Sequence, residues 1–327
     1  MNLLDRCTKA PAKRGYRFGF VFFLTLIANT CSNRYHGLPL IDASQSFSGW
    51  STRCYKEEAH IICVFLSHDV DWGKAGPSIS HIMARKERFS GDILKNGRLS
   101  NLYYNFPEYM EIEDRFHVRS TFFFRTYVRE STHPPPSYHV EEYRAEIRSL
   151  LSGGWEIGLH MDPASYPDID RMKQEKTALE NVTGCPIYGN RVHYTMNNEV
   201  LHANLQSLSF KYDASPKTTR EEIAIEDFGY FKRDKLLVFP MTVVDAWLFA
   251  HIATEENQVV DAVRMAIRQC LEFPKEKRIL TVIWHDCSLK MKKGRCYPEV
   301  LKYLASLGEV EMVRGIDLVE RIEKGNL

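Results

Sequence analysis

Residues 61–71 read Ile-Ile-Cys-Val-Phe-Leu-Ser-His-Asp-Val-Asp. The six apolar side chains at the start of this stretch are typical of a strand buried on both faces, which occurs in parallel sheets covered by helices. Polar residues follow the apolar run directly, so one histidine and two aspartates are expected at the C-terminal end of the strand. In parallel α/β folds, binding and catalytic groups gather at that end.

The rest of the chain repeats a pattern of strand, loop and helix. Further strands are predicted at residues 120–124, 155–159, 187–192, 236–239, 278–284 and 311–313. Helices are predicted at residues 140–151, 168–182, 198–208, 259–273, 297–307 and 316–324. This alternation implies an α/β fold with a parallel sheet, either a barrel or open, in which residues 73–117 form a partly helical insertion.

The composition is that of a globular protein. The 327 residues are 44% apolar and 26% charged, with 43 Lys and Arg against 42 Asp and Glu. These values exclude disordered, collagen-like and coiled-coil chains. A formal charge of +1 gives no electrostatic indication of nucleic-acid binding. No window reaches the ~20 apolar residues of an ordinary membrane span, which excludes a polytopic membrane protein.

Residues 1–55 are predicted to form a leader that precedes the domain at residues 56–327. Basic residues stand ahead of a short apolar run, residues 18–28, as in a signal peptide or a signal anchor. The alternative is a poorly structured leader without a targeting role. The eight cysteines are scattered and contain no C-x-x-C pair, so they do not identify the compartment. The sequence leaves open whether the protein is exported, membrane-anchored or cytoplasmic.

Polar residues also follow three other predicted strands. His160 ends the strand at 155–159, His193 and Tyr194 follow the strand at 187–192, and His285 follows the strand at 278–284. A single histidine at a strand end is usually a hydrogen-bonded rim residue. Histidines at several strand ends that face one mouth indicate a functional site.

Asp69 and Asp71 suggest what this site binds. In an extended chain residues i and i+2 point to the same side, so the two carboxylates lie close together. Their repulsion is relieved by a cation. One carboxylate and two imidazoles form a common zinc set, and the second carboxylate can then take a proton from water. The alternative is that both aspartates only cap the following turn.

Five segments of the chain occur in the order of a known set of family motifs. They are Ser67-His68-Asp69-Val70-Asp71, residues 120–124, residues 154–160, Arg191-Val192-His193-Tyr194 and Val282-Ile283-Trp284-His285. In this order they resemble the polysaccharide deacetylase family (NodB homology, carbohydrate esterase family 4) over residues 59–290. The first motif looks closest to a Ser/Thr-His-Asp-Val-Asp branch that includes deacetylases of surface-polysaccharide biosynthesis.

The resemblance implies a distorted (β/α)7-type barrel and a metal-dependent N-deacetylase that acts on N-acetylated sugars. By position, Asp69 matches the general base and Asp71 a metal ligand. The metal expected from the donor set is a divalent ion, zinc. The other matches are His160 as a metal ligand, Arg191 orienting the base, the backbone N–H of Tyr194 in an oxyanion hole, and His285 as the catalytic acid.

One departure from the family pattern concerns the metal. The family's second metal histidine lies four residues after the first, and here that residue is Ala164. His193 stands where the third motif normally has proline, so we expect His193 to be the third ligand, with Asp162 as the fallback. If neither binds, the site is inactive, and the chain is a carbohydrate-binding relative of the deacetylases without catalysis.

Two further aspartates, a basic loop and a second type of reaction are secondary candidates. Asp213 and Asp245 are candidates to orient catalytic groups or to bind sugar hydroxyls, although turn formation is slightly favoured for both. Four basic residues in the loop after His285 suit either a phosphate or plain solvation. Hydrolysis of another non-peptide C–N bond, as in allantoinase-like relatives, is the remaining alternative. The expected partner is an N-acetylated carbohydrate, with membrane contact only through an N-terminal anchor.

Overall fold

A computed structural model describes residues 61–96, 101–127 and 138–327. Its central strand, β1 (Ile62–Val70), is buried along its whole length. The first half of β1 pairs with β10 (Val310–Val313), its second half pairs with β2 (Thr121–Phe124), and β9 (Ile279–Ile283) lies along its other edge. All three pairings are parallel, as the continuous apolar run predicts.

The remaining strands extend the sheet on both sides of β1. They are β3 (Glu156–Met161), β4 (Gly189–Val192), β5 (Tyr212–Asp213), β6 (Phe231–Arg233), β7 (Leu236–Val238) and β8 (Val243–Val244). The order is β6-β7-β5-β4-β3-β2-β1-β9-β8, and only the β6–β7 pair is antiparallel. The sheet curls back on itself, and across the curl the Gly229 amide, just before β6, donates a hydrogen bond to the Ile279 carbonyl of β9 at 2.9 Å.

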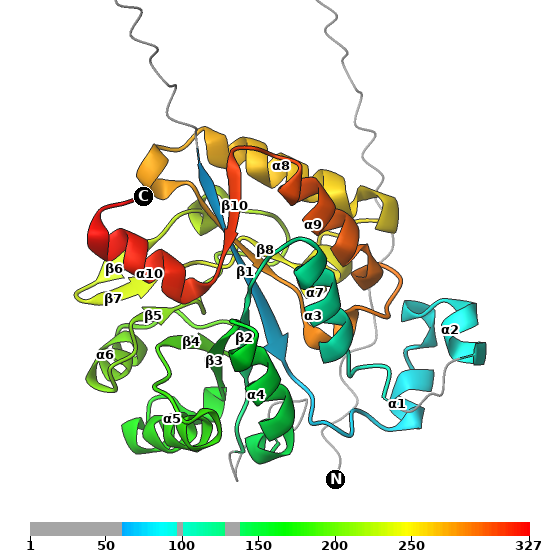
Figure 1. Ribbon diagram of the computed structural model, residues 1–327, viewed down its shortest axis with the longest axis horizontal. Coiled ribbons are helices and arrows are strands. Elements are labelled where there is room, and N and C mark those ends of the chain that lie inside the picture. The colour runs from blue at the N-terminus through cyan, green and yellow to red at the C-terminus, as the bar shows by residue number, and fades with distance from the viewer. Residues whose placement is uncertain (1–60, 97–100, 128–137) are drawn as a thin grey trace, which may run out of the picture. The chain divides into compact units, whose positions relative to one another are not determined.

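Helices surround this curled sheet (Figure 1). They are α1 (Ile79–Met83), α2 (Gly91–Asn96), α3 (Phe106–Arg115), α4 (Arg144–Ser152), α5 (Ile169–Thr183), α6 (Glu199–Ser207), α7 (Asp245–Ala250), α8 (Val259–Leu271), α9 (Tyr297–Ala305) and α10 (Gly315–Lys324). The result is a half-barrel of parallel strands with outer helices, so the expected distorted barrel fold is confirmed.

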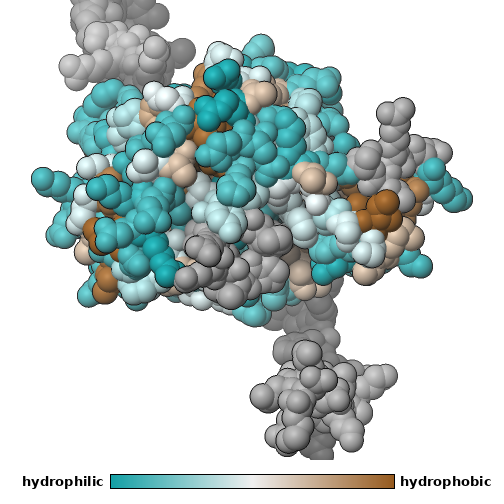
Figure 2. Space-filling model, turned by 90° about the horizontal axis from the view of Figure 1, so that it is seen from below, coloured by the Kyte–Doolittle hydropathy of each residue, from teal (hydrophilic) through white to brown (hydrophobic). Residues whose placement is uncertain are grey.

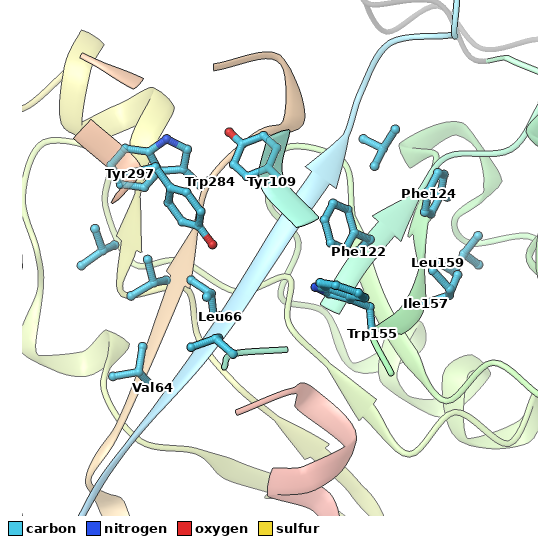
Figure 3. Packing of buried hydrophobic residues seen from close by; sticks show 14 of the residues in the cluster. Val64, Leu66, Tyr109, Phe122, Phe124, Trp155, Ile157, Leu159, Trp284 and Tyr297 are labelled. Carbon is cyan, nitrogen blue, oxygen red and sulfur yellow. The ribbon is translucent and has the colours of Figure 1, made fainter. Parts of the chain in front are cut away.

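Side chains along each strand alternate between the inside of the curl and the helix layer. On the outer side, Val64 and Leu66 of β1 join the core beneath the helices, together with Phe122, Phe124 and Trp284 (Figure 3). On the inner side, Phe65 packs edge to face against Tyr212 and Phe239, and the Phe123 ring is tilted against it. This inner layer forms the floor above which the polar strand ends lie.

The predicted elements agree with the structure except where elements are short. The two-residue strands β5 and β8, the three-residue β6 and the short helix α7 were not predicted, because so few residues carry no periodic signal. None of the helices in the described ranges is long and apolar enough to cross a membrane. The leader at residues 1–55, and the boundary after it, lie outside the described residues and stay predictions.

Candidate metal and acid–base site

Asp69 is held by a buried arginine at the inner side of the strand ends. Arg191 of β4 donates hydrogen bonds from Nη1 to Asp69 Oδ1 at 2.6 Å and from Nη2 to Ser67 Oγ at 2.9 Å. Its guanidinium also stacks on the Phe123 ring at 4.3 Å. Burial alone would raise the pKa of Asp69, but the charge of Arg191, together with those of His160 and His285, outweighs burial and lowers this pKa. Asp69 is therefore an oriented, ionised carboxylate.

Asp71 meets two histidine rings from neighbouring strands. Its Oδ1 lies 3.2 Å from His160 Nε2 and 3.1 Å from His193 Nδ1, and these two ring nitrogens are 3.1 Å apart. His160 ends β3, and His193 follows β4, so adjacent parallel strands bring them together. Burial alone would raise the pKa of Asp71, but the two imidazoles hold it well below its usual range.

These three atoms suit a divalent metal ion. His160 Nδ1 lies 3.0 Å from the Arg191 carbonyl, which can only accept, so Nδ1 carries a proton, and in the neutral ring the Nε2 lone pair is then available to an ion. Asp71 Oδ1 is buried and accepts no well-aligned hydrogen bond from a described residue. Around a tetrahedral zinc ion with ligands at about 2.0–2.1 Å, ligand atoms lie about 3.3 Å apart. The observed spacings fit that value, and the donor set fits zinc.

His285 lies across from this group and is paired with Asp245. Its Nδ1 is 2.5 Å from Asp245 Oδ1, its backbone N–H donates to Asp245 Oδ2 at 3.0 Å, and its Nε2 is 3.8 Å from Asp71 Oδ2. Burial alone would lower the pKa of His285, but the Asp245 carboxylate, with Asp71 and Asp69, raises it to about 10. His285 is therefore a positively charged imidazolium at neutral pH. Its partner, Asp245, is positioned by the short helix α7.

Tyr194 turns the chain at the rim beside His193. Its backbone is left-handed, with φ at 72°, which is uncommon for a residue other than glycine, and such outliers gather at functional sites. Its ring, 42% exposed, lies against the His193 ring with centroids 4.3 Å apart. The Val192 amide just before this turn donates to Ser215 Oγ at 2.8 Å. The turn at Tyr194 thus borders the site, and the hydrogen bond from Val192 to Ser215 holds the chain just before it.

The structure does not bring every candidate to this site. Asp213 of β5 points to the outer side of the sheet, where its buried carboxylate accepts hydrogen bonds from Asn190 Nδ2 at 2.8 Å and Ser215 Oγ at 2.5 Å. Its second oxygen lies 3.4 Å from His202 of α6. Asp213 supports the site only through Ser215, which holds the chain before Tyr194.

Asp162, the fallback metal ligand, has other partners. Its Oδ2 accepts a hydrogen bond from Arg125 Nη2 at 2.8 Å, in an ion pair with almost no exposure, and its Oδ1 caps the Ala164 amide at 2.8 Å. Asp162 does not belong to the group of described residues that could hold a metal ion, which is Asp71, His160 and His193. The structure thus places His193, and not Asp162, beside Asp71 and His160.

Two carboxylates near the site were not among the predicted residues. Asp286, next to His285, is buried, and burial together with the Asp71 charge raises its pKa well above the ordinary value. Glu113 of α3 lies behind β1, where it contacts His68. A signal for Asp286 was its place beside His285 at a strand end, whereas no local pattern connects Glu113 with His68.

Comparison with known proteins gives matches at the level of structure. No protein-family model matches the sequence, and no curated protein matches it either. A putative polysaccharide deacetylase from Mycobacterium smegmatis aligns with 17% identity over 83% of this chain and 93% of the other, with a TM-score of 0.56. A probable polysaccharide deacetylase from Pseudomonas aeruginosa PAO1 aligns with 16% identity over 82% and 93%, with a TM-score of 0.56.

An enzyme of different specificity matches equally well. The PuuE allantoinase aligns with 15% identity over 88% of this chain and its own whole length, with a TM-score of 0.57. At such low identity these matches establish the fold and leave the activity open. The resemblance to polysaccharide deacetylases is thus confirmed for the fold: the chain has the curled barrel that those deacetylases and this allantoinase share.

Proposed function

We propose that the protein is a metal-dependent hydrolase that removes an acetyl group from an N-acetylated sugar of a polysaccharide or glycan precursor. One observation carries the proposal. Three ligand atoms, from Asp71, His160 and His193, converge between an arginine-held carboxylate, Asp69, and a carboxylate-held imidazole, His285. Metal-assisted hydrolysis of an amide requires this combination of an ion, a base and an acid.

Asp71, His160 and His193 hold the ion in this proposal, and we expect zinc. A divalent ion bound there supplies Lewis acidity, which polarises the acyl carbonyl and lowers the pKa of water. Asp69 accepts the proton of the attacking water, and Arg191 keeps this carboxylate ionised and oriented. His285 donates its proton to the departing nitrogen, so that an amine and acetate are released. Asp245 keeps His285 protonated until that step.

The Tyr194 turn suits the remaining task, which is to stabilise the charge on the carbonyl oxygen. Tyr194 stands in a left-handed turn beside His193, and in this proposal its backbone N–H serves the oxyanion. Its half-exposed ring offers an apolar surface to a sugar ring. We assign the Tyr194 N–H to the oxyanion and its ring to the sugar.

A sugar amide is the first candidate substrate, and a ureide is the second. The match to two polysaccharide deacetylases supports the sugar. The match to the PuuE allantoinase over its whole length supports hydrolysis of another non-peptide C–N bond. A binding protein without catalysis is disfavoured, because the Asp69–Arg191 and His285–Asp245 pairs have no use in simple sugar recognition.

The test is elemental analysis of the purified full chain, followed by measurement of acetate release from N-acetylated oligosaccharides. We expect about one zinc or other divalent ion per chain, and release of acetate that stops when a chelator removes the ion. His193→Ala should lose the metal. His251→Ala serves as the matched control, since His251 is an exposed histidine after α7.

The outcomes separate the alternatives. Hydrolysis of allantoin without acetate release would select the ureide substrate. A chain that binds no divalent ion, even with excess zinc, would overturn the proposal, and Ala164 would then mark a degenerate site. A fully metallated and active His193→Ala protein would refute the ligand set.

A further inference from the structure

The insertion between β1 and β2 presents two apolar side chains to solvent. Ile79 and Met83 of α1 are 60% and 45% exposed, and their i, i+4 spacing puts them on one face of the helix. Ile82 of the same helix is fully buried, in a cluster that includes Phe89 and Tyr103. The helix is therefore anchored by its inner face, while its outer face has no apolar partner among the described residues.

The loop that follows His285 belongs to the same surface. The Lys292 amide donates a hydrogen bond to the Arg88 carbonyl at 2.8 Å, which ties this loop to the turn after α1. Cys287 packs in the same cluster as Ile82. We call α1, the turn Lys86–Arg88 and the loop 289–295 the docking face. Because its loop begins just after His285, the docking face borders the candidate site.

Positive charge is concentrated here. Residues 74–95 contain five basic and two acidic residues, and residues 289–295 contain four basic residues and no acidic one. The two segments carry a net charge of +7, although the whole chain carries only +1. Six of these cations have no ion pair with a carboxylate of the described residues: Arg85, Lys86, Arg88, Lys95, Lys292 and Lys293.

We propose that the docking face binds the surface of an anionic lipid bilayer. Unpaired cations alone would suit any polyanion, but exposed Ile79 and Met83 among them favour a partner with an apolar interior beneath an anionic surface. Figure 2, seen from the end where β1 finishes, shows a hydrophobic patch at the right, over the segment with α1 and α2, bordered by hydrophilic side chains. Docking would hold the mouth of the candidate site close to lipid headgroups.

The test measures binding of the full chain to vesicles by sedimentation. The vesicles contain phosphatidylcholine alone or with about one third phosphatidylglycerol, at low and at high salt. We expect binding to the anionic vesicles that weakens as salt rises, since exposed charges are screened. Each cation removed should lower the partition coefficient about fivefold. The double variant Lys86→Glu with Lys292→Glu should therefore lose more than tenfold, and Ile79→Ser with Met83→Ser should also lose several-fold.

Matched controls lie away from the docking face. Lys232→Glu with Arg233→Glu reverses two charges on strand β6, and Met265→Ser removes a side chain of α8 that is 58% exposed. Residues 1–60 are present in every variant, so differences between variants report on the docking face. All the substituted side chains are at least partly exposed, and circular dichroism checks that each variant is folded.

Two results would overturn the proposal. In the first, docking-face variants and control variants bind vesicles equally well. In the second, binding depends on Lys86 and Lys292 but is unaffected by Ile79→Ser with Met83→Ser, and heparin is bound as tightly as the vesicles. That result would identify a soluble polyanion as the partner. Neither readout involves hydrolysis, so the outcome is independent of the proposed function.

Discussion

The two sides of β1 carry the same residue types, histidines and carboxylates, with different arrangements of partners. On the outer side His68 is fully buried, with Nδ1 2.7 Å from the Trp284 carbonyl and Nε2 2.7 Å from Glu113 Oε1. Glu113 also accepts hydrogen bonds from the Tyr297 hydroxyl at 2.7 Å and from Trp155 Nε1 at 2.6 Å. Figure 3 shows the Trp284, Tyr297 and Trp155 rings among the buried side chains on this side of the sheet. Every ring nitrogen and carboxylate oxygen in the network has a partner.

On the inner side the same residue types converge on one another. On the outer side, each ring nitrogen of His68 has its own oxygen partner, Nδ1 with the Trp284 carbonyl and Nε2 with Glu113. On the inner side, Asp71 Oδ1, His160 Nε2 and His193 Nδ1 lie 3.1 to 3.2 Å from one another. The comparison teaches that ligand atoms from three residues converging on one point, rather than a histidine at a strand end, distinguish a candidate metal site from a structural network.

The largest expected effect is on the inner side, at the proposed base. Asp69→Asn keeps the size of the side chain but cannot accept a proton, so we expect kcat to fall about 1,000-fold. Metal content should stay at that of the unchanged protein, because Asp69 is not among the three ligand atoms. Acetate release and elemental analysis on the same preparation check both statements. A fall in kcat of less than tenfold would mean that Asp69 is not the general base.

On the outer side, Glu113→Gln should lower the stability of the fold rather than change the hydrolysis reaction. Removing one partner of a buried, charged pair costs about 3 kcal/mol, and Gln cannot serve as acceptor at both oxygen positions. Urea unfolding with and without zinc measures this cost. The stabilisation that zinc gives to the unchanged protein should persist in Glu113→Gln and disappear in Asp71→Asn. Loss of zinc stabilisation in a folded Glu113→Gln protein would mean that the two sides of β1 act as one unit.

Sequence predicts the inner side better than the outer side. The apolar run before Ser67 gives the strand, and strict alternation then puts Asp69 and Asp71 on one side. The side of the sheet to which Asp213 points does not follow from the sequence in this way, because the two-residue strand β5 carries no alternating pattern of its own. The contact between Glu113 and His68 spans 45 positions in sequence. Such a contact follows from how α3 packs on the sheet, which no local pattern encodes.

The pairing of His285 with Asp245 predicts a pH dependence in the metal-free protein. The folded pKa of His285, about 10, lies above its ordinary value of 6.5, so protonated His285 stabilises the fold. This contribution is complete below pH 6.5 and is lost as pH rises toward 10, at no more than about 1.4 kcal/mol per pH unit. Asp245→Asn removes the main charge that raises this pKa, so its stability should fall less steeply between pH 7 and 9.5.

Chemical unfolding at several pH values compares the two proteins. Parallel curves for the unchanged chain and Asp245→Asn would show that Asp245 does not control the His285 proton. In the active enzyme the same substitution should move the basic limb of the rate profile to lower pH, because His285 then loses its proton earlier.

The smallest expected effect distinguishes the two candidate third ligands. Asp162→Asn removes the charge that pairs with Arg125 and leaves the Asp71, His160 and His193 atoms unchanged, so zinc affinity should stay within about threefold of the unchanged protein. His193→Ala removes a ligand atom and should weaken zinc binding more than 100-fold. Competition with a chromogenic chelator measures both. The reverse order, with zinc lost from Asp162→Asn and kept by His193→Ala, would mean that the loop after β3 rearranges on metal binding and that the Arg125 pair is broken to supply the ligand.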